Sequence, residues 1–118
     1  MTKKKSLRFG LRHKGRRIFI DVKRDNGAIG LMFKKRENAS ALLFEFDPRS
    51  RIPLHSWFVF FPFLVIWLDG NNKMLEMRVI NPFSFRILPR KSFSNAVEIP
   101  LNKKYSRIIQ KLVGKRKV

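Results

Sequence analysis

The chain contains no cysteine, and this absence removes several kinds of chemistry. Without thiols there are no disulfides, no thiolate nucleophile and no sulfur-ligated metal. We therefore expect a protein that works in the cytoplasm, where disulfides are rare. The N-terminal residues 1–17 are basic, but no apolar segment follows them, so they do not have the form of a secretory signal.

Histidine and acidic residues are also scarce, with two His and eight Asp or Glu in 118 residues. His13 and His55 lie far apart and belong to no metal-ligand motif. The sequence has no glycine-rich phosphate loop and no motif that marks a serine as a nucleophile. We interpret Asp69 as a turn residue and Glu98 as a strand residue. We predict no catalytic residues, metal, cofactor or small-molecule substrate, although a site assembled from distant residues would leave no motif.

Long hydrophobic runs are missing apart from the segment Ile52–Asp69, of which residues 57–68 carry no charge. A membrane-spanning helix needs about twenty such residues, and Pro62 would interrupt a helix. Aromatic and β-branched residues favour strands. We predict two strand segments, Trp57–Phe61 and Phe63–Leu68, bent at Pro62 and buried on both faces at the centre of a closed or barrel-like β-core. The alternative is a surface patch for a membrane or a partner.

Alternating apolar and polar residues indicate further strands, and turn residues separate them. The expected strands are Arg17–Lys23, Ala41–Phe46, Met74–Ile80 and Ser94–Ile99. The turn Asp69–Asn72 should join the central strand to the next one as a hairpin, with Leu75, Met77 and Val79 on one face. Residues 47–51 and 83–91 read as loops.

The C-terminal segment has the pattern of an amphipathic helix. Asn102 is a candidate cap, and Gly114 would end the helix. Five apolar residues fall on one helical face: Tyr105, Ile108, Ile109, Leu112 and Val113. Such a helix can lie on a membrane, but we expect this one to pack on its own domain.

The formal net charge of +19 is extreme for a domain of this size. Twenty of the 27 Lys and Arg lie in the first 36 and the last 16 positions. The sequence therefore divides into a basic arm (1–16), a β-domain (17–101) and a basic helix and tail (102–118). Within the arm, Leu7, Phe9 and Leu11 alternate with other residues. This pattern fits either a strand or an extended arm that orders on a polyanion.

The order of four motifs resembles a family of small archaeal and bacterial β-domains, domain of unknown function 192. The family has a GLM-x-R segment, a short apolar strand, a stretch of the type HTFFMRFPIDVVFLD and an E-L/V-P segment. Matching segments here are Gly30–Arg36, Leu42–Phe46, His55–Asp69 and Val97–Pro100. The resemblance covers roughly residues 17–100 and implies a mostly β, barrel-like fold.

The chain departs from this family at positions that bear on function. Phe60 and Leu64 stand where the family has a basic residue and an acid around its proline. The family's glycine after the E-L/V-P segment and its glycine-aspartate near the C-terminus are also missing, and the basic helix stands in their place. A polar site built from those positions is therefore not expected here, and the family has no settled activity to carry over.

The leading hypothesis is a non-catalytic protein that binds structured RNA, as a ribosomal or ribosome-associated protein. Its partners would be ribosomal RNA and neighbouring ribosomal proteins, with most of the affinity coming from phosphate contacts. The candidate RNA-binding residues are Lys3, Lys4, Lys5, Arg8, Arg12, Lys14, Arg16, Arg17, Lys34, Lys35, Arg36, Arg49, Arg51, Arg86, Arg90, Lys91, Lys103, Lys104, Arg107, Lys111, Lys115, Arg116 and Lys117.

Phe83 or Phe85 could stack an unpaired base in this hypothesis, although both residues are more simply read as core. Alternatives for the whole protein are non-specific DNA binding, a small β-barrel enzyme or ligand binder, and a peripheral membrane protein. We expect no membrane partner, because the terminal helix has a narrow apolar stripe without Trp or Phe.

Overall fold

Six strands and a short C-terminal helix make up the computed structural model, which describes residues 6–25, 31, 35–50, 59–83, 87 and 89–114, with residues 25 and 46–50 described by their backbone only. The strands are β1 (Ser6–His13), β2 (Arg16–Asp25), β3 (Leu42–Ser50), β4 (Phe63–Leu68), β5 (Met74–Ile80) and β6 (Phe93–Pro100). The helical elements are η1 (Arg36–Asn38), η2 (Lys103–Tyr105) and α1 (Ser106–Val113). The fold is thus mainly β, as predicted.

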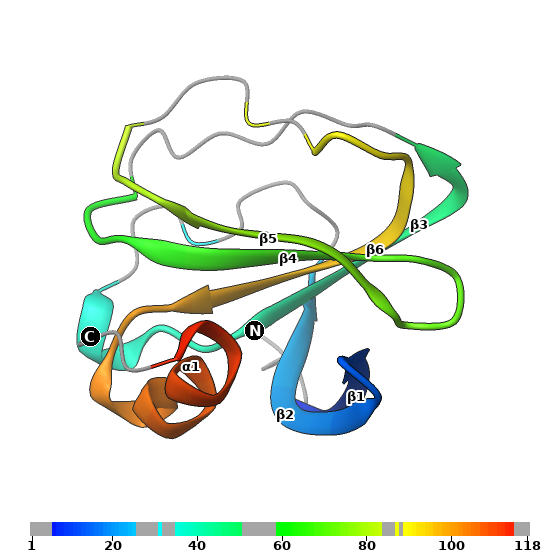
Figure 1. Cartoon of the computed structure of the whole chain (residues 1–118). Coiled ribbons are helices and arrows are strands. Elements are labelled where there is room, and N and C mark those ends of the chain that lie inside the picture. Colours follow the sequence, from blue (N-terminus) through cyan, green and yellow to red (C-terminus); the bar gives the residue numbers. More distant parts are fainter. Residues whose placement is uncertain are drawn as a thin grey trace.

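The strands form one curled sheet in the order β1-β2-β3-β6-β4-β5 (Figure 1). All neighbouring strands are antiparallel except β2 and β3, which pair in parallel. The curl brings the outer strand β1 to the β4–β5 turn, where the Arg12 N–H donates to the Asn72 carbonyl at 2.8 Å. The sheet is therefore a half-barrel.

Strand β4 lies inside the sheet between β5 and β6, and all six of its residues are buried. Leu64, Ile66 and Leu68 face one hydrophobic cluster, which we call the inner core, while Phe63 and Trp67 face another on the opposite side, which we call the outer cluster. This confirms the prediction of a strand that is covered on both faces. The preceding segment is not a strand over residues 59–61, where the prediction was wrong, and residues 57 and 58 lie outside the described residues.

The N-terminal segment is a strand rather than an extended arm over residues 6–13. β1 pairs with β2 along its full length. Lys14 and Gly15 form the turn between them, with φ of 52° and 75°, and positive φ at both central residues is typical of a type I′ hairpin turn. The alternation of β1 and β2 buries Phe9, Leu11, Ile20 and Val22 against the inner core.

Two sequence predictions fail because the ladders contain irregularities. Residues 47–50, predicted as a loop, continue β3, whose register with β6 shifts between Glu45 and Ser50. Pro48 is tolerated in such a strand because irregular positions need no ladder N–H. In β5, Leu75 packs on the outer cluster, opposite to Met77 and Val79. The register between β4 and β5 shifts between Trp67 and Leu68, which pair with Glu76 and Met74. Leu75 is therefore the extra residue and faces the opposite side from Met77.

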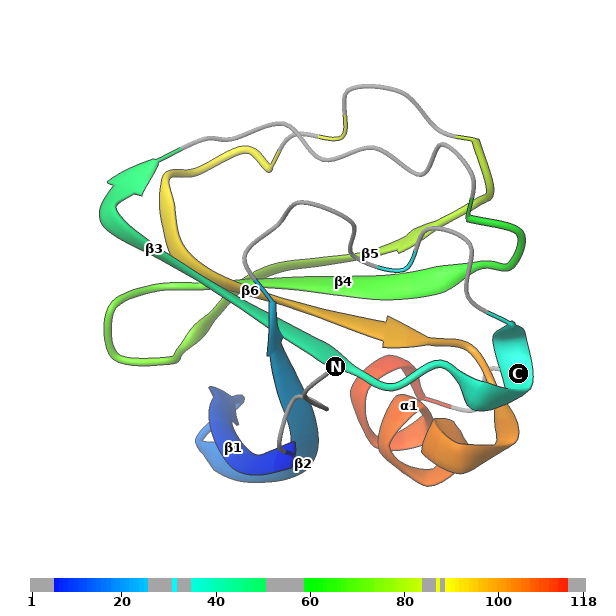
Figure 2. The ribbon, with the colours of Figure 1, turned by 180° about the vertical axis from the view of Figure 1, so that it is seen from behind.

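The C-terminal helix packs its apolar face on the inner core beside β2 (Figures 1 and 2). Tyr105, Ile109 and Leu112 are buried, as the predicted stripe requires. The Tyr105 hydroxyl accepts a hydrogen bond from the Ala41 N–H at 2.7 Å. Asn102 precedes η2, but its side chain makes no capping hydrogen bond and instead donates to the Arg36 and Ala39 carbonyls. Asn102 thus occupies the N-cap position of η2, as predicted, but its side chain does not cap the helix.

Candidate nucleic-acid interface

A groove of about 1150 Å³ runs between the β1–β2 hairpin and α1. The hairpin contributes residues near its turn and along β2, and the helix contributes its last turns. Thirteen of the described residues line the groove: Arg8, His13, Lys14, Arg16, Arg17, Ile18, Phe19, Met77, Ile108, Lys111, Leu112, Val113 and Gly114. The fold thus places cations of the N-terminal hairpin and Lys111 of the C-terminal helix on one groove.

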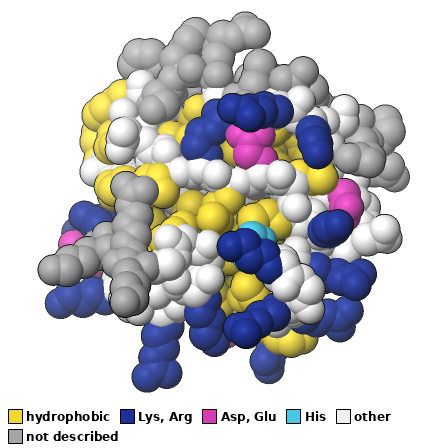
Figure 3. Space-filling model, viewed as in Figure 1, with side chains coloured by type: hydrophobic (Ala, Val, Ile, Leu, Met, Phe, Trp, Pro, Cys, Tyr) yellow, Lys and Arg dark blue, Asp and Glu magenta, His cyan; other side chains and the backbone are white. Residues whose placement is uncertain are grey.

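Five of the residues that line this groove are cationic, and none of the thirteen is acidic. The rim cations, as we call them, are exposed: Arg8, Lys14, Arg16, Arg17 and Lys111. All five were predicted from the sequence as RNA-binding residues. Figure 3 shows Lys and Arg side chains gathered along the lower part of the molecule, over the hairpin and the helix. Cations that line one groove without an acid favour an anion there.

The floor of the groove is hydrocarbon. It consists of partly or fully buried side chains from β2, β5 and α1: Ile18, Met77, Ile108, Leu112 and Val113. Ile18, Met77, Ile108 and Val113 also pack against the inner core, so the floor is fixed by the fold. The groove therefore combines an apolar floor with a basic rim.

Phe19 is a surface aromatic that the sequence analysis missed. It is 44% exposed, on the opposite face of β2 from Ile18 and Ile20. Its ring lies over Gly10, where an added Cβ would come within 3.0 Å of Phe19 Cε1. The Arg8 guanidinium carbon lies 4.6 Å from the ring centroid, within cation–π range. The sequence did carry a signal for this surface residue, because Phe19 lies between Ile18 and Ile20 in an alternating strand and must face away from them.

A second, smaller pocket of about 300 Å³ continues from the groove, with which it shares His13 and Lys14. Arg12 and Lys73 add two cations there. Asp69 also lines this pocket, but its Oδ1 accepts the N–H groups of Asn71 at 2.8 Å and Lys73 at 2.9 Å. The carboxylate therefore stabilises the turn, as the sequence predicted for Asp69.

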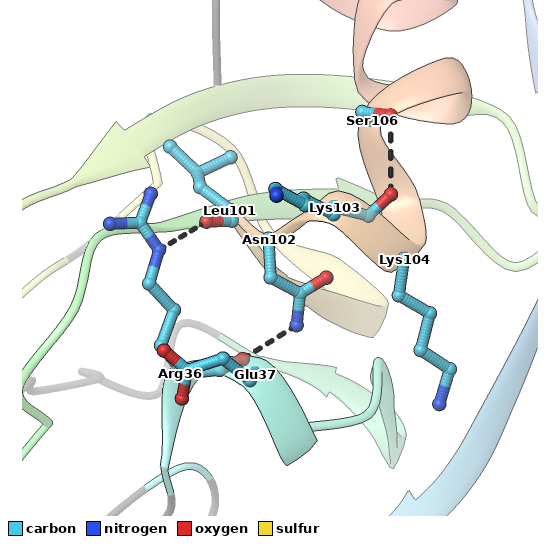
Figure 4. A pocket seen from close by; sticks show the side chains of 7 residues that line it. All are labelled: Arg36, Glu37, Leu101, Asn102, Lys103, Lys104 and Ser106. Carbon is cyan, nitrogen blue, oxygen red and sulfur yellow. Dashed lines mark hydrogen bonds between the residues drawn. The ribbon is translucent and has the colours of Figure 1, made fainter.

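The predicted cations near η1 and η2 surround a separate pocket of about 490 Å³ (Figure 4). Arg36 Nε donates to the Leu101 carbonyl at 2.6 Å, and Asn102 Nδ2 donates to the Arg36 carbonyl at 2.7 Å. Lys104 Nζ lies 3.3 Å from Ser40 Oγ. Arg36 and Asn102 thus tie η1 to η2, and Glu37 adds an acid to the lining. The lining of this pocket therefore carries less net positive charge than the lining of the groove.

Other predicted residues lie away from the groove. Lys35, Lys91, Lys103 and Arg107 are exposed on other parts of the surface. Arg90 is also exposed, and its backbone N–H donates to Glu76 Oε1 at 2.8 Å.

Glu76 has a shifted pKa. Burial acts to raise the pKa of Glu76. Hydrogen bonds from the Arg90 N–H and the Arg78 guanidinium, together with the positive charges of these two arginines, outweigh burial and hold the pKa below its ordinary value. Arg78 also lies 5.2 Å from the Trp67 ring centroid. This cluster stabilises β5 and holds an arginine against an acid, so it is a poor anion site.

Several predicted residues lie outside the described residues, namely Lys3, Lys4, Lys5, Lys34, Arg51, Arg86, Lys115, Arg116 and Lys117. The side chain of Arg49 is likewise outside them, as are His55 and Phe85. Phe83 is 49% exposed rather than core, and its ring meets that of Phe60 edge-on at 5.6 Å.

Within the described ranges, no three His, Asp or Glu side chains come close enough to hold a metal ion. Over the same part of the chain, no helix has the length and hydrophobicity to cross a membrane.

Comparison with known proteins supports the fold and leaves the function open. No family model and no curated protein matches the chain. The resemblance to the domain of unknown function 192 family therefore stays a prediction.

Two crystal structures share the fold. A protein of unknown function from Novosphingobium aromaticivorans matches with a TM-score of 0.67 at 14% identity, over 87% of this chain and 78% of its own. A "putative transcription regulator" from Sinorhizobium meliloti matches with a TM-score of 0.68 at 14% identity, over 92% of this chain and 89% of its own. Such identities establish a common fold only.

Proposed function

We propose that this protein is a non-catalytic RNA-binding protein that holds RNA phosphates along the groove between the β1–β2 hairpin and α1. One observation carries the proposal. The thirteen residues that line the groove include the five rim cations, and none of the thirteen is an acid. A polyanion offsets this repulsion and releases its own counterions, which makes binding favourable and salt-dependent.

The distribution of charge supports RNA as the polyanion. Lys and Arg outnumber Asp and Glu by 27 to 8, which exceeds what a single small anion would require. A groove bordered by a hairpin and a helix also suits irregular RNA, where phosphate and 2′-hydroxyl contacts dominate over base reading. The five rim cations give the groove a definite phosphate path, and the cations of the smaller pocket extend it.

We further propose that the RNA is ribosomal and that neighbouring ribosomal proteins share the site. Support comes from the sequence, which combines a small folded centre with basic ends. Proteins of this kind fill irregular spaces between RNA helices with little need for sequence-specific contacts.

Sedimentation of native lysate through a sucrose gradient at low and moderate salt tests the ribosomal proposal. We expect the protein, followed by mass spectrometry, to travel with one ribosomal subunit at both salt concentrations. Release of all protein to the top of the gradient at low salt would exclude a ribosomal partner.

A competition assay separates RNA from DNA. Unlabelled ribosomal RNA should displace a labelled RNA fragment at lower concentration than duplex DNA of equal phosphate content does. Equal competition by duplex DNA would instead indicate a non-specific DNA-coating protein.

A further inference from the structure

We infer that the groove accepts a single-stranded RNA segment, with one unpaired base stacked on the Arg8–Phe19 pair. This inference rests on the proposed function and adds the class of RNA that the groove selects. It also moves the stacking residue from Phe83, which the sequence suggested, to Phe19.

The apolar floor is the first reason. A double helix presents phosphates and sugars to a groove of this kind, and these polar groups gain nothing from contact with a hydrocarbon surface. The bases of an unpaired strand have apolar faces that can cover the partly buried Ile108 and Val113 while the phosphates meet the rim cations. Floor and rim together therefore match a strand whose bases turn inward.

The position of Phe19 is the second reason. Its ring borders the same groove and is held in place, because one edge rests on Gly10 and Arg8 lies over the ring. A preorganised aromatic loses little conformational freedom on binding. Aromatic rings with an arginine beside them are the common platform for unpaired bases, because every base has a π-face.

The size of the groove is the third reason. Small-molecule pockets measure roughly 300–1,000 Å³, and this groove is open and larger, at about 1150 Å³. The rim cations are distributed over the hairpin and the helix rather than converging on one point. That arrangement suits several successive phosphates better than one anionic head group.

Fluorescence anisotropy with a labelled decamer of uridine, a matched RNA duplex and anionic phospholipid vesicles as competitor tests the inference. Phe19→Ala should weaken binding of the single strand roughly tenfold to a hundredfold, with the salt dependence unchanged. Phe19→Trp should retain the affinity, because the indole keeps the stacking surface that Phe19→Ala removes. Phe60→Ala, which truncates another exposed Phe (60% exposed), should bind within about twofold of the unaltered protein.

The outcomes separate the inference from the proposed function. If Phe19→Ala binds as the unaltered protein does, or the duplex binds more tightly than the single strand, stacking in the groove is overturned while RNA binding stands. If neither RNA binds at low salt, the proposed function fails as a whole. Displacement of the single strand by vesicles at lower anion concentration than by unlabelled RNA would make an anionic lipid the occupant and would also overturn the inference.

Discussion

The rim cations predict a specific salt dependence. If each of the five meets one phosphate of a single strand, the slope of log K against log salt is about −3.5, because each contact contributes about 0.7. Raising the salt from 50 to 200 mM should then weaken binding about 100-fold. Replacing two rim cations, as in Arg16→Gln with Lys111→Gln, should reduce the slope to about −2.1. Anisotropy titrations at four salt concentrations measure these slopes.

A matched control separates the groove from net charge. Lys35→Gln with Lys91→Gln also removes two exposed cations, but neither side chain lines the groove. Both double variants carry the same net charge and should have similar stability, since surface substitutions usually change it by less than about 0.5 kcal/mol. The control should keep the slope of the unaltered protein. Equal losses of slope in both variants would refute a localised site and leave only diffuse attraction.

Three further predictions concern the scaffold of the groove, and each is measured by urea unfolding. Glu76 has a lowered pKa when folded, so its charge stabilises the fold above the unfolded-state pKa and loses this effect as the pH falls through the folded-state value. Glu76→Gln should therefore be less stable than the unaltered protein at pH 7 and differ little at low pH; a constant difference would contradict this. Tyr105→Phe should cost about 1–3 kcal/mol, because the buried Ala41 N–H loses its acceptor; unchanged stability would show that another group satisfies the N–H. Gly15→Ala should cost about 1–2 kcal/mol because φ is positive there, whereas Gly15→Asn should cost less; equal costs would argue against backbone strain.

The core strand and its hairpin follow from local sequence patterns. The residues of β4 form an apolar run that can only be covered on both faces, and the structure buries all six. The Asp69–Asn72 turn and the alternation after it place β5, and the helical spacing places α1. These features depend on residues that are close in sequence, so one chain suffices to find them.

The errors arise where geometry depends on distant partners. The register shift that turns Leu75 outward is set by β4, and the extension of β3 through Pro48 is set by β6. The turn at Lys14 and Gly15 lacks the Asn or Asp that usually marks a two-residue hairpin. Such features appear only when the paired strands are seen together.

The groove itself shows how far charge patterning leads. The basic character of both ends was evident from composition. The packing of α1 next to the hairpin is what places Lys111 and the hairpin cations around one apolar floor. Among the predicted cations that the structure describes, those outside the groove either lie elsewhere on the surface or, like Arg36, make hydrogen bonds within the fold. Among the described residues, proximity in the fold therefore selects the five rim cations, which line one groove, from the longer list of predicted cations.

The most direct test of the RNA site is an amide chemical-shift titration of the 118-residue protein with the uridine decamer. We predict that the largest shifts fall on residues around Arg8 and Phe19 in the hairpin and around Lys111 in α1. Shifts concentrated instead near Phe60 and Phe83, or spread evenly over all exposed cations, would contradict the assignment of the groove as the RNA-binding site.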